Sequence, residues 1–262
     1  MADEDATERA TVFGSIAEDY ARLRPAPCAG AVDWLVPAGA RRVLDLAAGA
    51  GTLTGMLAAR VPEVVAVEPD PRMRSVLAAR NPGLTVLDGT AEAIPLPDGG
   101  LDAVVVASAW HWFDPVRAVP EVARVLRPGG RLSVVWNGLD DSVPWVDSWR
   151  TGLRAARAER EHFPRGERLS EELTAPGSPF APPEHDVFTC THPATPADAA
   201  ALLGTYSRLL LLPEEERRAL VAQAEQALHD RPDLLSPDGT VPLPFRSLCW
   251  RATRTGPAVP AA

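Results

Sequence analysis

The most constraining feature of this chain is an apolar run that ends in a small-residue turn, followed by an apolar run that ends in a carboxylate. Residues 43–54 read Val-Leu-Asp-Leu-Ala-Ala-Gly-Ala-Gly-Thr-Leu-Thr, a pattern typical of strand, turn and helix. The second run, residues 64–69, ends in Glu68 and Pro69. Gly49 and Gly51 have no Cβ, so a ligand can approach their backbone closely. Glu68 offers two acceptor oxygens, which suit the two hydroxyls of a ribose. The two runs together predict a nucleoside-binding α/β protein.

Apolar runs and helix-compatible segments continue to alternate along the chain. Strands are expected near 42–47, 63–68, 84–88, 101–107 and 131–137, with helices between them. This alternation predicts a parallel sheet with right-handed crossovers. Beyond residue 137 we expect a helix over 143–162, a proline- and glycine-rich loop over 164–183, a strand near 186–191, a helix over 214–230 and a last strand over 244–252.

Charge and hydropathy narrow the range of partners. The net charge is −9 and lysine is absent, which disfavours nucleic acid, since contacts to phosphate supply most of that affinity. No apolar stretch reaches 18 residues, so no membrane span is expected. The first residues are acidic rather than basic and then apolar, unlike a secretory signal. We therefore expect a cytoplasmic protein that binds neither membrane nor nucleic acid. No metal-binding spacing emerges from the cysteines.

Further segments follow the first turn in a fixed order. They are Val-Glu-Pro at 67–69, Leu-Asp-Gly-Thr-Ala-Glu at 87–92, Ile-Pro-Leu-Pro-Asp at 94–98, Leu-Asp-Ala-Val-Val-Val at 101–106, Trp-His-Trp-Phe-Asp at 110–114 and Leu-Arg-Pro-Gly-Gly-Arg at 126–131. With the turn at 44–51, this ordered set resembles class I S-adenosylmethionine-dependent methyltransferases. Within that group it is similar to the small-molecule type that includes trans-aconitate methyltransferases.

The resemblance implies an architecture. We expect a Rossmann-like, doubly wound α/β fold with a seven-stranded, mostly parallel sheet whose last strand is antiparallel. Residues 1–36 would form an N-terminal helical lid, and 37–254 the methyltransferase domain. An insertion at 138–183, after the fifth strand, would lie on the substrate side, and 255–262 would be a tail.

The resemblance also implies a cofactor, S-adenosyl-L-methionine, with S-adenosyl-L-homocysteine as the product. Glu68 would bind the ribose, with Pro69 beside the adenine. Thr90 stands where the family usually has an acidic residue, so Glu92 or Asp88 could substitute for it; alternatively Glu92 is a first-turn helix residue favoured by the helix dipole. The full expected set is Tyr20, Arg24, Asp45, Ala47, Gly49, Gly51, Glu68, Pro69, Thr90, Ala91, Glu92, Ala107 and Ser108.

The acceptor side depends on aromatic residues and one histidine. His111 is the candidate general base, because histidine titrates near neutral pH. It could instead contact the substrate, or simply pack between its aromatic neighbours. Trp112, Trp145 and Trp149 are candidate substrate contacts, although the spacing of the last two equally fits a core. We expect in-line methyl transfer to a small-molecule acceptor, most often at oxygen, and a peptide carboxylate would also fit. A carboxylate acceptor needs no base.

Two other classes of function remain open from the sequence. A nicotinamide-dependent oxidoreductase needs a third small residue after Gly49 and Gly51, and Thr54 occupies that position, which argues against it. A relative that binds S-adenosylmethionine without methylating would share every cofactor motif. Binding of cofactor without any demethylated product would distinguish that relative from an enzyme.

Overall fold

The computed structural model describes residues 22–152, 165–206, 209 and 212–256. Contacts between backbones divide the chain into two compact units. The sheet unit comprises Ala26–Asn137, Pro164–Phe188 and Ser247–Ala262. The helical unit comprises Met1–Pro25, Gly138–Phe163 and Thr189–Arg246. Tyr20 lies outside the described residues.

Seven strands in the described residues form one sheet in the order β3-β2-β1-β4-β5-β7-β6. Their bounds are β1 Arg42–Leu46, β2 Glu63–Val67, β3 Thr85–Leu87, β4 Leu101–Ala107, β5 Leu126–Leu139, β6 Glu184–Ala194 and β7 Val241–Thr253. Strands β1 to β5 pair in parallel. Strand β7 runs antiparallel to β5, because Gly129 N donates to Arg254 O at one end of the pair and Asp140 N to Pro244 O at the other. The predicted fold class is confirmed.

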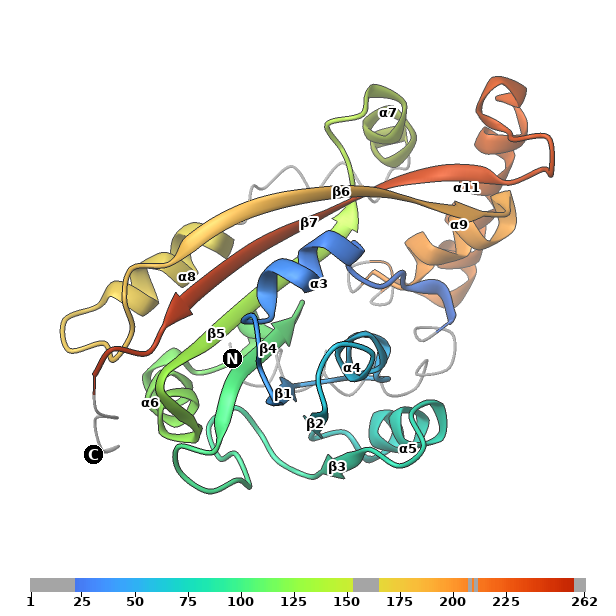
Figure 1. Cartoon of the computed structure of the whole chain (residues 1–262). Helices are drawn as coiled ribbons and strands as arrows, with labels where there is room; N and C mark the ends of the chain where they lie inside the picture. Colours follow the sequence, from blue (N-terminus) through green and yellow to red (C-terminus); the bar gives the residue numbers. More distant parts are fainter. Residues whose placement is uncertain (1–21, 153–164, 207–208, 210–211, 257–262) are drawn as a thin grey trace. The chain divides into compact units, whose positions relative to one another are not determined.

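The helices of the sheet unit flank its parallel strands. They are α3 Ala29–Leu35, α4 Thr52–Ala58, α5 Pro71–Arg80, the 3-10 turn η1 Trp110–Trp112, α6 Pro115–Val125 and α8 Arg165–Thr174. Helix α4 packs on β1 and β2, and α5 packs on β3 (Figure 1). Asp70 and Asp114 cap α5 and α6, each accepting backbone N–H bonds ahead of a proline at the first helical position, as helix starts favour.

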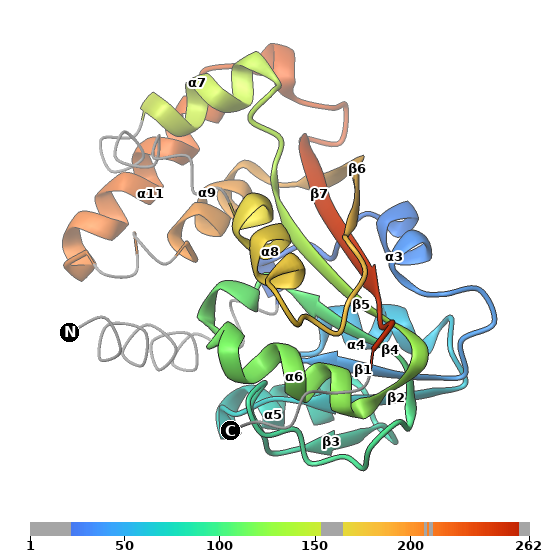
Figure 2. The same cartoon turned by 90° about the vertical axis from the view of Figure 1, so that its left-hand side faces the viewer.

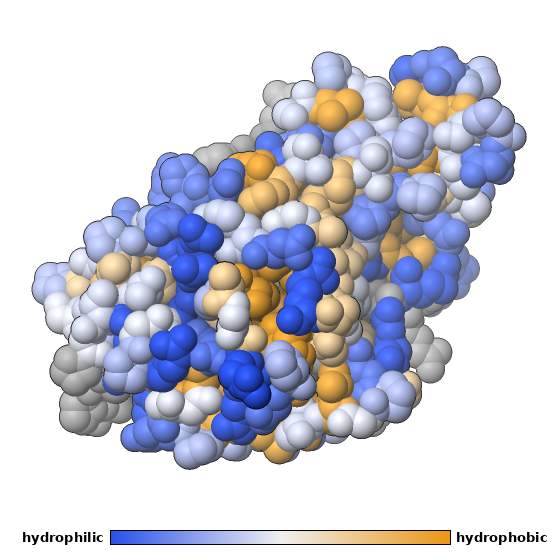
Figure 3. Space-filling model, in the orientation of Figure 1, coloured by the Kyte–Doolittle hydropathy of each residue, from blue (hydrophilic) through white to orange (hydrophobic). Residues whose placement is uncertain are grey.

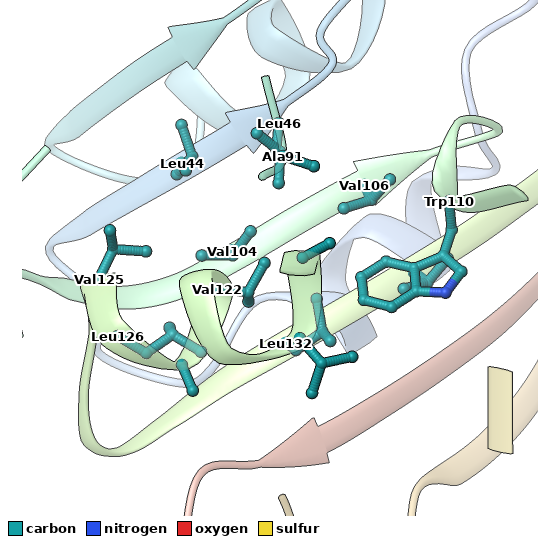
Figure 4. Close-up of a cluster of buried hydrophobic side chains, with 14 of the residues drawn as sticks. Leu44, Leu46, Ala91, Val104, Val106, Trp110, Val122, Val125, Leu126 and Leu132 are labelled. Carbon is teal, nitrogen blue, oxygen red and sulfur yellow. The ribbon is translucent and has the colours of Figure 1, made fainter. Parts of the chain in front are cut away.

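Alternation along the strands sorts side chains to the two faces of the sheet. One face buries Leu44, Leu46, Val104 and Val106 against α6 and α8. Figure 4 shows part of this cluster, with Val122 of α6 next to Val104 of β4. The opposite face meets α3 and α4. There Ser133 donates its hydroxyl to Leu35 O, and α3 and the pair α6 and α8 lie on opposite sides of β5 (Figure 2).

The helical unit has its own apolar core. It contains α7 Pro144–Gly152, α9 Pro196–Gly204, α11 Glu214–His229 and the short turn η3 Pro232–Leu234. Helices α9 and α11 pack together. Their buried side chains include Leu202 and Leu203 on α9 and Leu220, Ala224 and Leu228 on α11. Helix α9 was not predicted from the sequence.

The loop predicted for residues 164–183 was partly wrong, because Arg165–Thr174 forms α8. Leu169 and Leu173 are buried in the sheet-unit core and stabilise the helix by packing. The prolines and glycines that favoured a loop lie mainly at the start and beyond the end of α8. Helix α3 lies within the segment 1–36 that was predicted to be a lid. Its side chains Ala31, Val32 and Leu35 are instead buried in the sheet unit.

The surface of the described residues is mixed in character. On the face shown in Figure 3, hydrophilic side chains surround smaller groups of apolar ones. Val116 and Val187 are large apolar side chains that remain well exposed, at 81% and 50%. No helix in the described part of the chain has the length and hydropathy that crossing a membrane would need.

Candidate cofactor and acceptor site

The carboxyl ends of β1 and β4 mark the point where the strand order reverses. From β1 the chain builds the sheet outward through β2 and β3, and then returns to place β4 on the other side of β1. Ligands of open α/β sheets bind at such a switch point. Most of the sequence-predicted site residues follow β1, β2, β3 or β4, and all of those belong to the sheet unit.

The turn after β1 has an unusual backbone. Ala47, Gly49 and Gly51 all have positive φ, at 55°, 55° and 80°. A Cβ on Gly49 would meet nothing within 4 Å, whereas one on Gly51 would lie 2.7 Å from Leu77 Cγ. Gly51 is therefore required by packing of the turn on α5. At Gly49 the space in the direction of a Cβ is open, as close approach of a ligand would require.

Glu68 connects the ends of β1 and β2. Its Oε2 accepts Gly49 N–H at 2.8 Å and its Oε1 accepts Asp70 N–H at 2.9 Å. Burial raises the pKa of Glu68, while these two hydrogen bonds act in the opposite direction. Each carboxylate oxygen has two lone pairs, so both oxygens retain one acceptor position. Glu68 can thus fix the turn and still accept hydroxyl groups from a ligand.

Asp45 is fully buried beneath the same turn. Its Oδ2 accepts the Thr54 hydroxyl at 2.6 Å, and among the described residues its Oδ1 is buried without a hydrogen-bond partner. Burial, aided by the negative charge of Glu68 and opposed by the Thr54 hydrogen bond, raises the pKa of Asp45 to about 7. Two neighbouring buried carboxyls favour a ligand that carries positive charge.

Arg74 is a residue of this site that the sequence reasoning missed. Its Nη1 donates to Glu68 O at 2.8 Å, to Pro69 O at 2.6 Å and to Asp88 Oδ1 at 2.9 Å. It therefore ties the end of β2 to the segment after β3. The sequence did contain one signal for this role. Arg74 follows the cap Asp70 by four residues, and residues four apart lie on the same face of a helix.

The segment after β3 forms a turn rather than a helix. A backbone bridge joins Thr90 to Ala93, Thr90 is exposed and Ala91 is buried. Glu92 Oε1 accepts Asp114 N–H at 3.0 Å and so holds the start of α6. The alternative that placed Glu92 in the first turn of a helix was wrong. Asp88 pairs with Arg74 at 2.9 Å.

Ala107 ends β4 and is followed by Ser108, whose φ is 53°. Ser108 N donates to Val135 O at 2.7 Å, which pins this conformation to β5. In the described residues, Ala47 and Ser108 are the non-glycine residues with positive φ. They follow neighbouring central strands, and strained backbone of this kind clusters at functional sites.

The turn η1 carries His111 between two tryptophans. Trp110 is buried and its Nε1 donates to Glu172 Oε2 of α8 at 2.7 Å. His111 is half-buried, its Nδ1 accepts Trp136 Nε1–H at 3.4 Å, and its ring centroid lies 4.6 Å from that of Trp112. The histidine is thus presented by an anchored turn next to the end of β4.

Three of the predicted site residues that the structure describes belong to the helical unit instead. Arg24 donates to Thr205 Oγ1 at 2.9 Å and stacks 4.0 Å from the ring centre of Tyr206. Trp149 is 7% exposed, lies in the core of that unit and donates to Ala224 O at 2.9 Å. Trp145 packs against the same core. The sequence left open whether Trp149 contacts substrate or packs in a core, and in this structure Trp149 is a core residue.

No group of three or more His, Cys, Asp or Glu side chains in the described part of the chain is arranged to hold a metal ion. The polar groups at the strand ends are instead carboxylates, backbone N–H groups and one imidazole. These are groups that can bind an organic ligand.

Comparison with known proteins decides the family. The methyltransferase domain family matches residues 44–134, from β1 to within β5. An uncharacterized methyltransferase of Mycobacterium tuberculosis is 43% identical over 242 residues, which cover 92% of this chain and 95% of that protein. The chain belongs to the class I S-adenosylmethionine-dependent methyltransferases. It is a methyltransferase, and its cofactor is S-adenosylmethionine.

Two further similarities concern the structure and a more distant enzyme. A solved structure assigned as a type II methyltransferase from Anaeromyxobacter dehalogenans has a TM-score of 0.63 at 26% identity, and covers 89% of this chain and 99% of that one. A malonyl-[acyl-carrier protein] O-methyltransferase of Methylococcus capsulatus is 40% identical over 98 residues, or 35% of this chain and 36% of that enzyme. Membership of this family excludes the nicotinamide-dependent oxidoreductase that the sequence had left open.

Proposed function

We propose that this methyltransferase transfers a methyl group by in-line displacement to an oxygen atom of a small-molecule acceptor, a carboxylate or a hydroxyl. The observation that carries the proposal is His111, a polar side chain held in an aromatic turn beside the strained end of β4. The resemblance to trans-aconitate methyltransferases and the partial similarity to a malonyl O-methyltransferase support the same acceptor chemistry. A peptide carboxylate would suit it equally.

The proposal assigns the cofactor to the turn that Glu68 holds. Glu68 would accept the ribose hydroxyls with its two remaining lone-pair positions, and Pro69 with residues 90–92 would border the adenine. Asp45, Gly49 and Gly51 would surround the methionine part, with Ala47, Ala107 and Ser108 near the sulfur. The unpartnered, buried Oδ1 of Asp45 fits this assignment because the cofactor carries positive charge on its sulfur and amino group.

Bound S-adenosylmethionine supplies an electrophilic methyl group, so the chain itself needs to supply binding and alignment. Holding the acceptor oxygen near the methyl carbon can contribute roughly 7–11 kcal/mol. The anchored turn at 110–113 serves alignment, because Trp110 is hydrogen-bonded to Glu172 and its ring centroid lies 5.5 Å from that of Phe113. Trp112, on the same turn, would pack beside the acceptor.

The test is product identification. The full chain is incubated with methyl-labelled S-adenosylmethionine and a panel of carboxylic acids, alcohols, phenols and amines, and products are identified by mass spectrometry. Methyl esters or ethers together with S-adenosylhomocysteine are expected, and Glu68→Ala should reduce their formation. Glu63→Ala is the matched control, since Glu63 is exposed and begins strand β2, which Glu68 directly follows. Products methylated only at nitrogen or carbon, or cofactor binding without any transfer, would contradict the proposal.

A further inference from the structure

Trp136 of β5 makes a hydrogen bond that restricts the chemistry of His111. Its indole Nε1 donates to His111 Nδ1 at 3.4 Å, and an indole nitrogen can only donate. The nitrogen that accepts must therefore be unprotonated. A neutral imidazole carries its proton on the other nitrogen, so this contact selects the tautomer in which Nε2 bears the hydrogen.

Both partners of this hydrogen bond are held in place by their surroundings. Trp136 is 5% exposed and packs edge-on against Trp250 of β7, with ring centroids 5.3 Å apart at 80°. Trp250 is confined in turn by α8, because a Cβ on Gly166 would lie 2.0 Å from its ring. Such packing leaves the indole of Trp136 little freedom to turn its N–H away from His111.

The histidine is fixed from the side of its own turn. Trp110 donates to Glu172 Oε2 at 2.7 Å, and Arg168 holds the other oxygen of Glu172 at 2.7 Å. The backbone N–H groups of Trp112 and Phe113 bond to the carbonyls of Ala109 and Trp110. The imidazole is therefore presented on a rigid turn with Nδ1 directed at Trp136. Side chains that act in catalysis need this kind of support from a second layer of residues.

We propose that Trp136 is a positioning residue that fixes His111 as the Nε2-protonated tautomer, so that His111 donates a hydrogen bond to the acceptor and does not remove a proton from it. This inference rests on the proposed function, because it takes His111 to contact the acceptor. It narrows the acceptor to an oxygen that arrives already ionised, a carboxylate. A hydroxyl acceptor must lose a proton, and Nε2 of His111 in this tautomer has no lone pair to take it.

The charges balance for a carboxylate without any proton transfer. A carboxylate oxygen supplies the electron pair for the new bond to the methyl carbon. The pair from the broken carbon–sulfur bond stays on sulfur and neutralises its positive charge. The products are a methyl ester and a neutral thioether. The Nε2–H of His111 would orient the carboxylate by donating one hydrogen bond to its second oxygen, and His111 would take up no proton.

The tautomer can be measured directly by long-range proton–nitrogen NMR on the full chain with ¹⁵N-labelled histidine, without an acceptor. The His111 signals are assigned as those missing in His111→Gln. We expect neutral His111 at pH 7.5 with the proton on Nε2. Trp136→Phe keeps an aromatic ring but removes the donor, and should populate both tautomers. Trp34→Phe is the matched control, because Trp34 packs against Phe188 and Arg251 rather than against Trp136, and it should leave the Nε2–H tautomer in place.

A proton on Nδ1 in the wild type would overturn the inference even if Trp136→Phe fails to fold. An unchanged tautomer in folded Trp136→Phe would overturn the role of Trp136. In the methyl-transfer assay, Trp136→Phe should raise KM for a carboxylate by about fivefold with a smaller effect on kcat, as loss of one hydrogen bond predicts. Formation of ethers from alcohols, with the tautomer confirmed, would overturn only the carboxylate assignment. Absence of all transfer would instead overturn the proposed function.

Discussion

At the scale of single residues, Asp45 is an ionisable group that the fold removes from water. It is fully buried, bonded to Thr54 through one oxygen, and has a pKa raised to about 7 by burial, with a further contribution from Glu68. A carboxyl with a folded-state pKa above its unfolded value holds an extra proton in the native state. Stability contributed by that group therefore decreases as pH rises from the unfolded pKa to the folded pKa.

The decrease of stability with rising pH can be tested with the variant Asp45→Asn. Asparagine keeps the shape and an acceptor for Thr54 but cannot ionise, so the variant avoids the cost of charging a buried group. Relative to wild type, the unfolding free energy of the variant should rise by roughly 1.4 kcal/mol for each pH unit from 5 to 7, and level off by pH 8. Urea titrations across this range provide the measurement. A difference between the two proteins that is the same at pH 5 and pH 8 would show that the pKa of Asp45 is not raised.

Ala47 carries backbone strain that a glycine would not. Its φ of 55° lies in the left-handed region, which costs an alanine roughly 1–2 kcal/mol. Ala47→Gly should stabilise the chain by about 0.5–1 kcal/mol, after allowance for the greater freedom of glycine in the unfolded state. Ala48→Gly, one residue on and without positive φ, should destabilise by about 0.4–1 kcal/mol. Equal effects in thermal unfolding would contradict the assignment of strain to Ala47.

At the scale of elements, the joint between the first turn and α5 depends on Gly51. Its φ is 80°, and a Cβ there would lie 2.7 Å from Leu77 Cγ, a side chain with no exposed surface. We expect Gly51→Ala to lower the unfolding free energy by about 2–4 kcal/mol, since overpacking adds to backbone strain. Gly39→Ala is the matched control, because Gly39 has a φ of 74° and open space around it. It should cost only about 1 kcal/mol.

If both glycine variants lose the same stability in denaturant titrations, close packing at Gly51 is not what requires a glycine there. The outcome bears on function, because the same turn presents the Gly49 N–H to Glu68. Because the turn after β1 packs so closely on α5, its backbone can hardly move. Its position therefore determines where a ligand could contact the backbone.

The strands and helices differ in how well they could be predicted from the sequence. Strands β1, β2 and β4 were predicted to within a residue, because buried parallel strands are short apolar runs with clear ends. Helix α8 was missed because the prolines and glycines around it dominate residues 164–183, although its own sequence contains helix-favouring Glu, Leu and Arg. Helix α9 was missed because it is a short apolar segment without polar periodicity.

The same limit applies to the site. The motif residues after β1, β2 and β4 could be predicted because their roles follow from position at a strand end. Arg74 and Trp136 were missed, because the side chains that they bond, Asp88 and His111, lie 14 and 25 residues away in the sequence. Trp149 was ambiguous in the sequence, and only its hydrogen bond to Ala224 O and its burial identify it as core.

At the scale of the whole molecule, the family and the fold agree. The match to the methyltransferase domain spans residues 44–134, which contain the turn after β1, Glu68 and His111. This stretch lies within the sheet unit. Because this stretch carries the turn after β1 and Glu68, the cofactor is what the family match supports most directly.

The most direct test is titration calorimetry of the full chain with S-adenosylmethionine. Wild type, Glu68→Ala and the control Glu63→Ala are compared, with folding of each verified by circular dichroism. Loss of hydrogen bonds to a charged group costs about 1.5–3 kcal/mol, so Glu68→Ala should weaken binding by roughly 10- to 100-fold, while Glu63→Ala should bind as the wild type does. Wild-type affinity in folded Glu68→Ala would contradict the placement of the cofactor at the ends of β1 and β2.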